Sequence, residues 1–188
     1  VASVLAYAAA HNKDKIGALF FSDRIERWIA PERGMVHFGK IIETLFSLEP
    51  KGRKTNIKEA ISFLIGLKKR NSVVFMLSDW IDEIDSFSNL LKVASVKYDF
   101  VGIRFLDFCE KKLPNIGYLD VEDIESGECY TINTRDKENN INTILQSRLI
   151  EQERLCNSYK VDLLDLAVGH PFINELVSFF HKRIRRQV

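Results

Sequence analysis

Two residues in the sequence, Asp79 and Thr55, carry oxygen atoms that could bind a ligand or take part in catalysis. The apolar run 73–77 passes directly into Ser78 and Asp79, and the loop 52–55 ends in Thr55 just before a predicted helix. In open α/β sheets, ligands bind just beyond the carboxyl ends of the strands, which is where Asp79 is expected. A threonine hydroxyl at a helix start would point to the same rim. Both residues also have a plainer interpretation, since Asp79 can start a loop and cap the next helix, and Thr55 can cap a helix.

Familiar motifs of catalysis and nucleotide binding are missing from the sequence. Lys54 and Thr55 resemble the end of a phosphate-binding loop, but G-x-x-x-x-G-K-[ST] would need glycines where Leu48 and Arg53 stand. The chain has no G-x-S-x-G, G-x-G-x-x-G or H-E-x-x-H pattern. Its four histidines are scattered without ligand spacing. The carboxylates after Asp79 suit a helix start, where negative charge is favourable, better than a metal cage.

Composition and charge are ordinary for a globular protein. The 188 residues are 46% apolar and 28% charged, with a net charge of +1, so no nucleic-acid partner is expected. Three widely spaced cysteines favour a reduced, intracellular setting. No apolar run approaches the ~20 residues needed to span a bilayer. We therefore expect a cytoplasmic location without a membrane span, although a longer parent protein could carry an anchor elsewhere.

The elements that would position Thr55 and Asp79 alternate between strands and helices. Strands are expected at 15–21, 24–30, 72–78, 98–106 and 161–167, and helices at 1–13, 36–48, 56–69, 87–95, 137–159 and 170–186. A β-hairpin is expected at about 117–133, with its turn at Ser126 and Gly127. This alternation predicts an α/β fold with a mostly parallel sheet covered by helices on both faces. Because no linker or repeat interrupts it, residues 1–188 are expected to form a single domain.

Several residues mark the ends of these elements. Asn56 followed by Glu59 has the spacing of a capping box, which predicts a helix start near Asn56. The stretch from Pro31 to Gly34 is predicted to be a turn. Pro171 is predicted to be the first residue of the last helix. The basic sequence HKRIRR near the end of that helix suits a helix C-terminus better than polyanion binding.

The order of four segments resembles a known bacterial family. "DKIGALFFSDRIERWIAPERG", "KTNIKEAISFL", "SVVFMLSDWID" and "YDFVGIRFLDFCEKKLP" are similar to the von Willebrand factor A-like domain of domain-of-unknown-function family 58. The resemblance implies a doubly wound, von Willebrand factor A or Rossmann-like fold with a metal-ion-dependent adhesion site. It makes Thr55 the second-loop ligand and Asp79 the third-loop ligand of a Mg²⁺ ion. It also suggests a MoxR-type AAA+ ATPase as the protein partner.

The sequence departs from this family pattern at its start. The Asp-x-Ser-x-Ser loop, which supplies most ligands in such sites, and the strand before it would lie upstream of Val1. Mg²⁺ prefers about six oxygens, so Thr55 and Asp79 alone should bind it weakly or not at all. Without that first strand, the strands at 16–21 and 73–77 would each have an unpaired edge, and such edges invite pairing with another chain. We therefore expect either a homo-oligomer through these edges or a longer parent chain.

Three functions fit the sequence. The first is a non-enzymatic protein–protein interaction module that grips a partner's acidic side chain through Mg²⁺ held by Thr55 and Asp79. The second is a metal-dependent phosphohydrolase that uses Asp79, but hydrolysis needs a nucleophile with a matched base or two metals, and no such set is visible. The third is a metal-free assembly module whose contact is the hairpin at 117–133. In that case, Asp79→Ala should leave partner binding intact.

Overall fold

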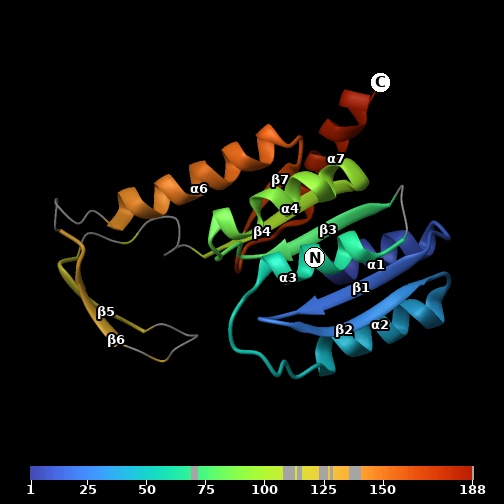
Figure 1. The fold of residues 1–188 in the computed structure, drawn as a ribbon, viewed down its shortest axis with the longest axis horizontal. Helices are drawn as coiled ribbons and strands as arrows, with labels where there is room; N and C mark the ends of the chain where they lie inside the picture. Colours follow the sequence, from blue (N-terminus) through green and yellow to red (C-terminus); the bar gives the residue numbers. More distant parts are fainter. Residues whose placement is uncertain are drawn as a thin grey trace. The chain divides into compact units, whose positions relative to one another are not determined.

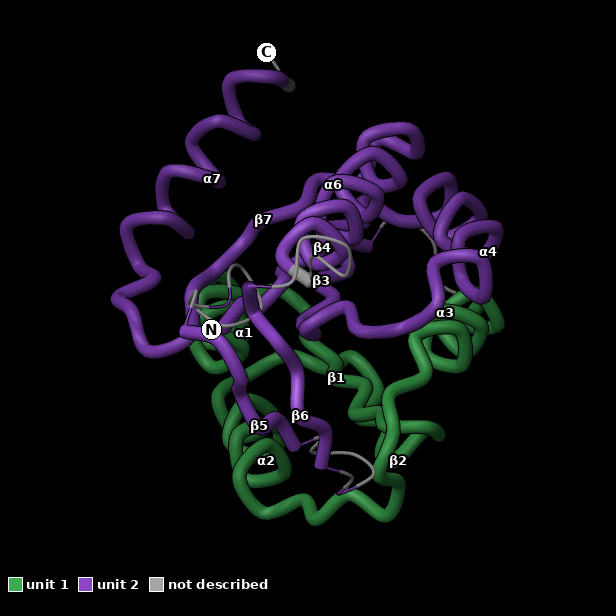
Figure 2. Tube along the Cα trace, turned by 90° about the vertical axis from the view of Figure 1, so that its left-hand side faces the viewer, with its two compact units in different colours: residues 1–68 green, residues 69–188 purple. Residues whose placement is uncertain are grey.

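The computed structural model describes residues 1–68, 72–107, 113, 116–122, 127, 129–135 and 141–187. The chain divides into two compact units, Val1–Lys68 and Lys69–Val188, which are coloured separately in Figure 2. The expectation that both act as one domain stays a prediction.

Unit 1 is an antiparallel two-stranded ribbon packed against helices (Figure 1). Its elements, in chain order, are α1 (Ala2–His11), β1 (Ile16–Phe21), β2 (Ile25–Glu32), α2 (Met35–Ser47) and α3 (Ile57–Gly66). Ile29 of β2 is buried in one apolar cluster with Ala10 of α1 and Ile41 of α2. The neighbouring Trp28 must point to the other face of the ribbon, where its ring contacts Phe63 of α3. Helices therefore cover both faces of the ribbon.

The predicted turn at Pro31 to Gly34 is wrong at its first two residues, because β2 continues through Pro31 to Glu32. β2 pairs with β1 on one side only among the strands that the structure describes. A proline is tolerated on such an edge because its missing N–H removes no ladder hydrogen bond. Gly17 on β1 fits this geometry, since a Cβ atom there would lie 2.8 Å from the Ile29 carbonyl oxygen and 2.9 Å from the Pro31 ring. The edge strand thus extends two residues beyond the segment 24–30 whose alternating pattern predicted it.

Unit 2 contains a parallel three-stranded sheet of order β3-β4-β7 and a separate β5–β6 hairpin. Its elements are β3 (Val73–Ser78), α4 (Ile84–Lys97), β4 (Asp99–Leu106), β5 (Tyr118–Glu122), β6 (Cys129–Asn133), α6 (Ile141–Ser158), β7 (Asp162–Ala167) and α7 (Ile173–Gln187). These findings confirm the predictions of a mixed α/β fold, of a parallel sheet and of a hairpin. Of the predicted turn residues, Gly127 has a positive φ of 72°, whereas Ser126 lies outside the described residues.

Helices lie on both faces of the parallel sheet. On one face, Phe180 of α7 contacts Phe75 of β3, with 5.8 Å between the ring centroids. On the other face, Arg104 of β4 bonds Gln152 of α6. Phe75 lies opposite Val101 of β4, so these two side chains point to the same face. Val101 is an odd number of residues from Arg104 on β4, so Arg104 points to the other face. The sheet core is therefore shielded from water on both sides, as its apolar strand sequences predict.

Other boundaries differ in detail from the sequence predictions. α7 begins at Ile173, so Pro171 precedes the helix and is not its first residue. α4 runs from Ile84 to Lys97 and is longer than the predicted 87–95. Within the ranges that the structure describes, no helix combines the length and apolar character needed to cross a bilayer.

Candidate functional site

Asp79 lies in a tight turn directly after β3. The amide of Ile81 donates to Oδ1 of Asp79 at 3.0 Å, and the Ser78 hydroxyl donates to the same oxygen at 3.2 Å. The amide of Trp80 donates in turn to the Ser78 hydroxyl at 3.1 Å. No hydrogen bond to Oδ2 of Asp79 appears within the described ranges, and the side chain is half-buried. The turn thus fixes the carboxylate through one oxygen and leaves the other for a ligand.

Part of the plainer interpretation of Asp79 is wrong. The helix after the turn, α4, begins at Ile84 with Glu83 at its N-cap position, so Asp79 does not cap it. The carboxylate stabilises its own turn instead, by bonding the amide two residues ahead as aspartates commonly do in loops.

Trp80 holds this turn in the sheet core. Its φ of 62° is in the left-handed region, which a bulky residue rarely adopts, and its side chain is fully buried. The indole ring lies over Gly102 of β4, where an added Cβ would come within 2.5 Å of the ring. The ring also contacts Phe87 of α4 edge to face, with 6.1 Å between the centroids. The backbone strain at Trp80 is therefore tolerated because close packing fixes the position of its indole ring.

A buried polar network supports the same turn from three elements. Gln152 of α6 donates from Nε2 to the Trp80 carbonyl at 2.7 Å. Arg104 of β4 donates from Nη1 to Oε1 of Gln152 at 2.6 Å, and its Nε and Nη2 each bond a carboxylate oxygen of Asp165 on β7 at 2.8 Å. Arg104 and Gln152 are 3% and 1% exposed. Because a buried guanidinium must be paired, this network fixes the position of the Trp80 carbonyl and hence of the Asp79 turn.

Thr55 lies in unit 1, at the end of the loop between α2 and α3. The next residue, Asn56, is the N-cap of α3, and its side chain accepts from the Glu59 amide at 2.9 Å. The predicted helix start at Asn56 is confirmed, and the interpretation of Thr55 as the cap is wrong. The Asn56 amide donates to the Ser22 carbonyl at 2.9 Å, which ties the Thr55 loop to the end of the β1–β2 ribbon.

Glu26 of β2 anchors this loop more firmly. Its Oε1 accepts from the amides of Lys51 and Gly52 at 3.0 and 2.8 Å, and from the Ser22 hydroxyl at 2.5 Å. The hydrogen bond from Ser22, followed by that from the Gly52 amide, lowers the pKa of Glu26 below its usual value. A Cβ at Gly52 would collide with the Asp23 carboxylate and the Ser22 hydroxyl, so a larger residue there would have to displace both side chains.

The two predicted metal ligands belong to different units, Thr55 to unit 1 and Asp79 to unit 2. Their joint membership of one site stays a prediction. In the part of the chain that the structure describes, no three histidine, cysteine, aspartate or glutamate side chains gather in a way that could hold a metal ion.

Sequence reasoning missed the residues that hold these loops. Glu26 was part of a strand predicted to have a wet face, and Gln152 was part of an amphipathic helix. Arg104 offered a usable signal, because an arginine inside an apolar strand must be paired when it is buried. Its partners, 48 and 61 residues later, have no such signal in the sequence.

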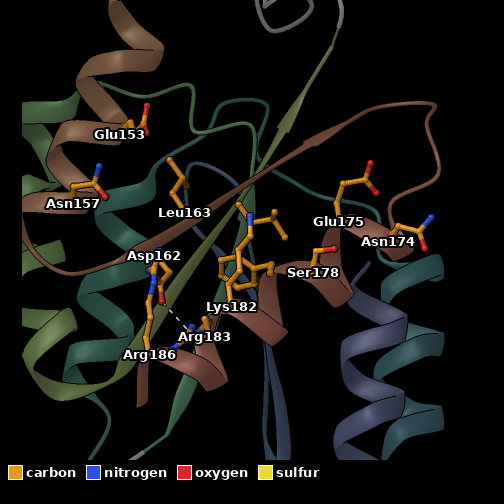
Figure 3. Close-up of a pocket in the computed structure, with 12 residues that line it drawn as sticks. Glu153, Asn157, Asp162, Leu163, Asn174, Glu175, Ser178, Lys182, Arg183 and Arg186 are labelled. Carbon is orange, nitrogen blue, oxygen red and sulfur yellow. Dashed lines mark hydrogen bonds and ion pairs between the residues drawn. The ribbon is translucent and has the colours of Figure 1, made fainter. Parts of the chain in front are cut away.

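A hollow of about 640 Å³ lies beside β7, between α6 and α7 (Figure 3). Its lining is part apolar and part polar, and it carries charges of both signs. The residues are Glu153, Asn157, Asp162, Leu163, Leu164, Asn174, Glu175, Ser178, Phe179, Lys182, Arg183 and Arg186. No motif in the sequence indicates this region.

Comparisons with known proteins give a family match and a structural match. The family model described as "Protein of unknown function DUF58" matches residues 1–148. The crystal structure of the conserved hypothetical protein BatB from Bacteroides thetaiotaomicron is similar over 100% of this chain and 87% of that chain, with a TM-score of 0.53 and 11% sequence identity. At that identity, the likeness concerns the fold alone. None of the curated proteins compared with the chain matches it.

Proposed function

Since the chain belongs to the DUF58 family of proteins of unknown function, we propose that it is a von Willebrand factor A-like, non-enzymatic interaction module with a metal-ion-dependent adhesion-type site. Asp79 and Thr55 contribute an oxygen ligand each. The observation that carries the proposal is the Asp79 turn, in which local hydrogen bonds hold one carboxylate oxygen and leave the other for a cation.

The position of Asp79 in the sheet supports this function. It follows the carboxyl end of β3, in a parallel sheet with helices on both faces. Ligand sites of doubly wound sheets are built at that end. The buried Trp80 and its network keep the turn rigid, and rigid support is what a binding carboxylate requires if it is not to lose affinity through reorganisation.

The chemistry of the donors supports Mg²⁺ as the ion. A carboxylate and a hydroxyl are hard oxygen ligands, and Mg²⁺ needs about six oxygens, so an Asp-x-Ser-x-Ser loop of the kind found in such domains would have to supply most of the rest. A remaining open position would accept an acidic side chain of a protein partner. By the family resemblance, a MoxR-type AAA+ ATPase is the partner to test first.

Calorimetric titration with Mg²⁺ tests this proposal. The chain alone should bind weakly, and a longer form that carries the Asp-x-Ser-x-Ser loop should bind measurably. Asp79→Ala should abolish that binding, whereas Asp85→Ala, an exposed carboxylate in the first turn of α4, should leave it unchanged. Equal binding by wild type and Asp79→Ala would rule the site out.

A metal-free assembly role is the second candidate, and one observation favours it. The β5–β6 hairpin exposes Tyr118 and Tyr130, which are 78% and 50% accessible. Exposed tyrosines are frequent anchors of protein interfaces. If the hairpin is the contact, Tyr118→Ala weakens partner binding and Asp79→Ala does not, which reverses the result expected for the metal site.

A further inference from the structure

β7 is an edge strand of the parallel sheet. The Val168 amide donates to the Leu106 carbonyl at 3.0 Å, so the main-chain groups of even-numbered residues along β7 face β4. Those of Leu163 and Asp165 must then face away from β4, because the direction alternates along a strand. Within the described ranges, no strand pairs with this outer side. An edge with free donors and acceptors is a template for another strand.

The hollow of Figure 3 lies beside the first half of this free edge. Asp162, Leu163 and Leu164 form its floor, while α6 and α7 form its walls. These helices lie on opposite faces of the sheet. The space between them therefore lies in the plane of the sheet, where a further strand could be added beside β7. β7 contains no proline and no lysine that would protect the edge from pairing, and the charges of its two aspartates are paired with arginines of the same chain.

Charges are separated along the α7 wall. Arg186 and Arg183 form ion pairs with Asp162, at the start of β7. Lys182 therefore lies toward that end, while Glu175, about two helical turns earlier on α7, lies toward the other end of the hollow (Figure 3). The wall thus has a basic end near the start of β7 and an acidic residue near the opposite end.

We propose that the free edge of β7 pairs antiparallel with β7 of a second copy of this chain, which joins the two parallel sheets into one across a two-fold axis. Antiparallel pairing places the start of one β7 beside the end of the other. Lys182 of each copy then lies near Glu175 of the other, so the charge separation becomes complementary and each contact occurs twice. This contact differs from the β1 and β3 edges expected from the sequence, and it does not depend on the metal site.

Charge-reversal variants test the pairing. In sedimentation velocity experiments, Lys182→Glu and Glu175→Lys should each raise the dimer dissociation constant by about tenfold or more, because each homodimer would contain two like-charge contacts. An equimolar mixture should regain wild-type association as a heterodimer, since one variant is acidic and the other basic at both positions. Arg185→Glu is the matched control, because Arg185 is exposed on the same helix and does not line the hollow. It should leave the dissociation constant unchanged.

Amide hydrogen exchange locates the contact and checks folding. The Leu163 and Asp165 amides should exchange slowly in the wild-type dimer and faster in Lys182→Glu, while amides between β3 and β4 stay protected in both. The proposal is overturned by a wild-type monomer at all accessible concentrations, or by a mixture of variants that fails to associate. It is also overturned by a dimer in which these two amides exchange freely. Protection of the two amides only when a monomer binds an extended peptide would overturn it as well, because the hollow would then belong to a different partner.

Discussion

The side-chain amide of Gln152 donates a 2.7 Å hydrogen bond to the main-chain carbonyl of Trp80, 72 residues earlier in the chain. This bond connects α6 to the turn that holds Asp79. Because the other end of the Gln152 amide accepts from Arg104, one buried side chain links the candidate ligand turn to the centre of the sheet.

Replacement of Gln152 should therefore destabilise unit 2. Gln152→Leu keeps the volume but leaves the Trp80 carbonyl and one Arg104 nitrogen without their close partner, at a cost of about 2 kcal/mol. Urea denaturation followed by tryptophan fluorescence measures the loss. Glu151→Leu, at the exposed neighbouring position, is the control and should change the unfolding free energy by less than ~0.5 kcal/mol. Equal stability of wild type and Gln152→Leu would show that the network does not support the turn.

The pair Arg104 and Asp165 should show strong energetic coupling. Asp165→Ala leaves the buried guanidinium with its charge uncompensated and should cost about 2–3 kcal/mol, a moderate value for such a loss because Asp165 itself is partly exposed. Arg104→Met in the same chain removes that buried charge. The double variant should thus be more stable than the sum of the two single losses predicts. A double-mutant cycle by urea denaturation measures the coupling, and additive losses would contradict it.

Much of this architecture could be predicted from local sequence signals. Asn56 and Glu59 marked a helix start because a cap is a contact between near neighbours, and the structure confirms it. The apolar run ending at Ser78 marked the carboxyl end of a strand for the same reason. The turn predicted at Pro31 is wrong because the sequence does not show which edge of a strand is unpaired, and a proline is tolerated on an unpaired edge.

The contacts that support the candidate site could not be predicted in this way. Arg104, Gln152 and Trp80 come from three separate elements, and only the folded sheet brings them together. The pairing of Thr55 with Asp79 depends in addition on how two units are arranged. Local pattern can thus indicate which side chains end strands, but not what holds them in place.

Two glycine substitutions should shift stability in opposite directions. Gly102→Ala forces a methyl group into the buried Trp80 ring, and rigid overpacking of this kind costs about 1–3 kcal/mol. Gly39→Ala is the matched control, because Gly39 lies exposed within α2 and an added Cβ there meets nothing within 4 Å. It should stabilise by about 0.5–1 kcal/mol through helix propensity. Thermal unfolding of both variants measures the change in stability. An unchanged stability of Gly102→Ala would contradict the close contact between Gly102 and the Trp80 ring.

The anchor of the Thr55 loop should weaken in acid. Since the pKa of Glu26 is lowered in the folded state, its contribution is fully present above the ordinary value of 4.5 and is lost as the pH falls through the folded-state value. Glu26→Gln should melt below wild type at pH 7, and the gap should close as the pH drops below 4.5. Glu43→Gln, on the exposed side of α2, is the control for the loss of one carboxylate. A gap that stays constant with pH would exclude a role for the Glu26 charge.

Cysteine reactivity should distinguish the interior of unit 2 from its hairpin. Burial raises the pKa of Cys156 to about 12, so almost no thiolate forms at pH 8 and the buried sulfur should resist alkylation. Cys129 is exposed on β6 and should react with iodoacetamide in the native protein. Mass spectrometry of digested samples, taken with and without urea, measures both sites. Cys156 should become modified only when urea unfolds the sheet, and rapid native modification would mean that α6 opens away from β7 in solution.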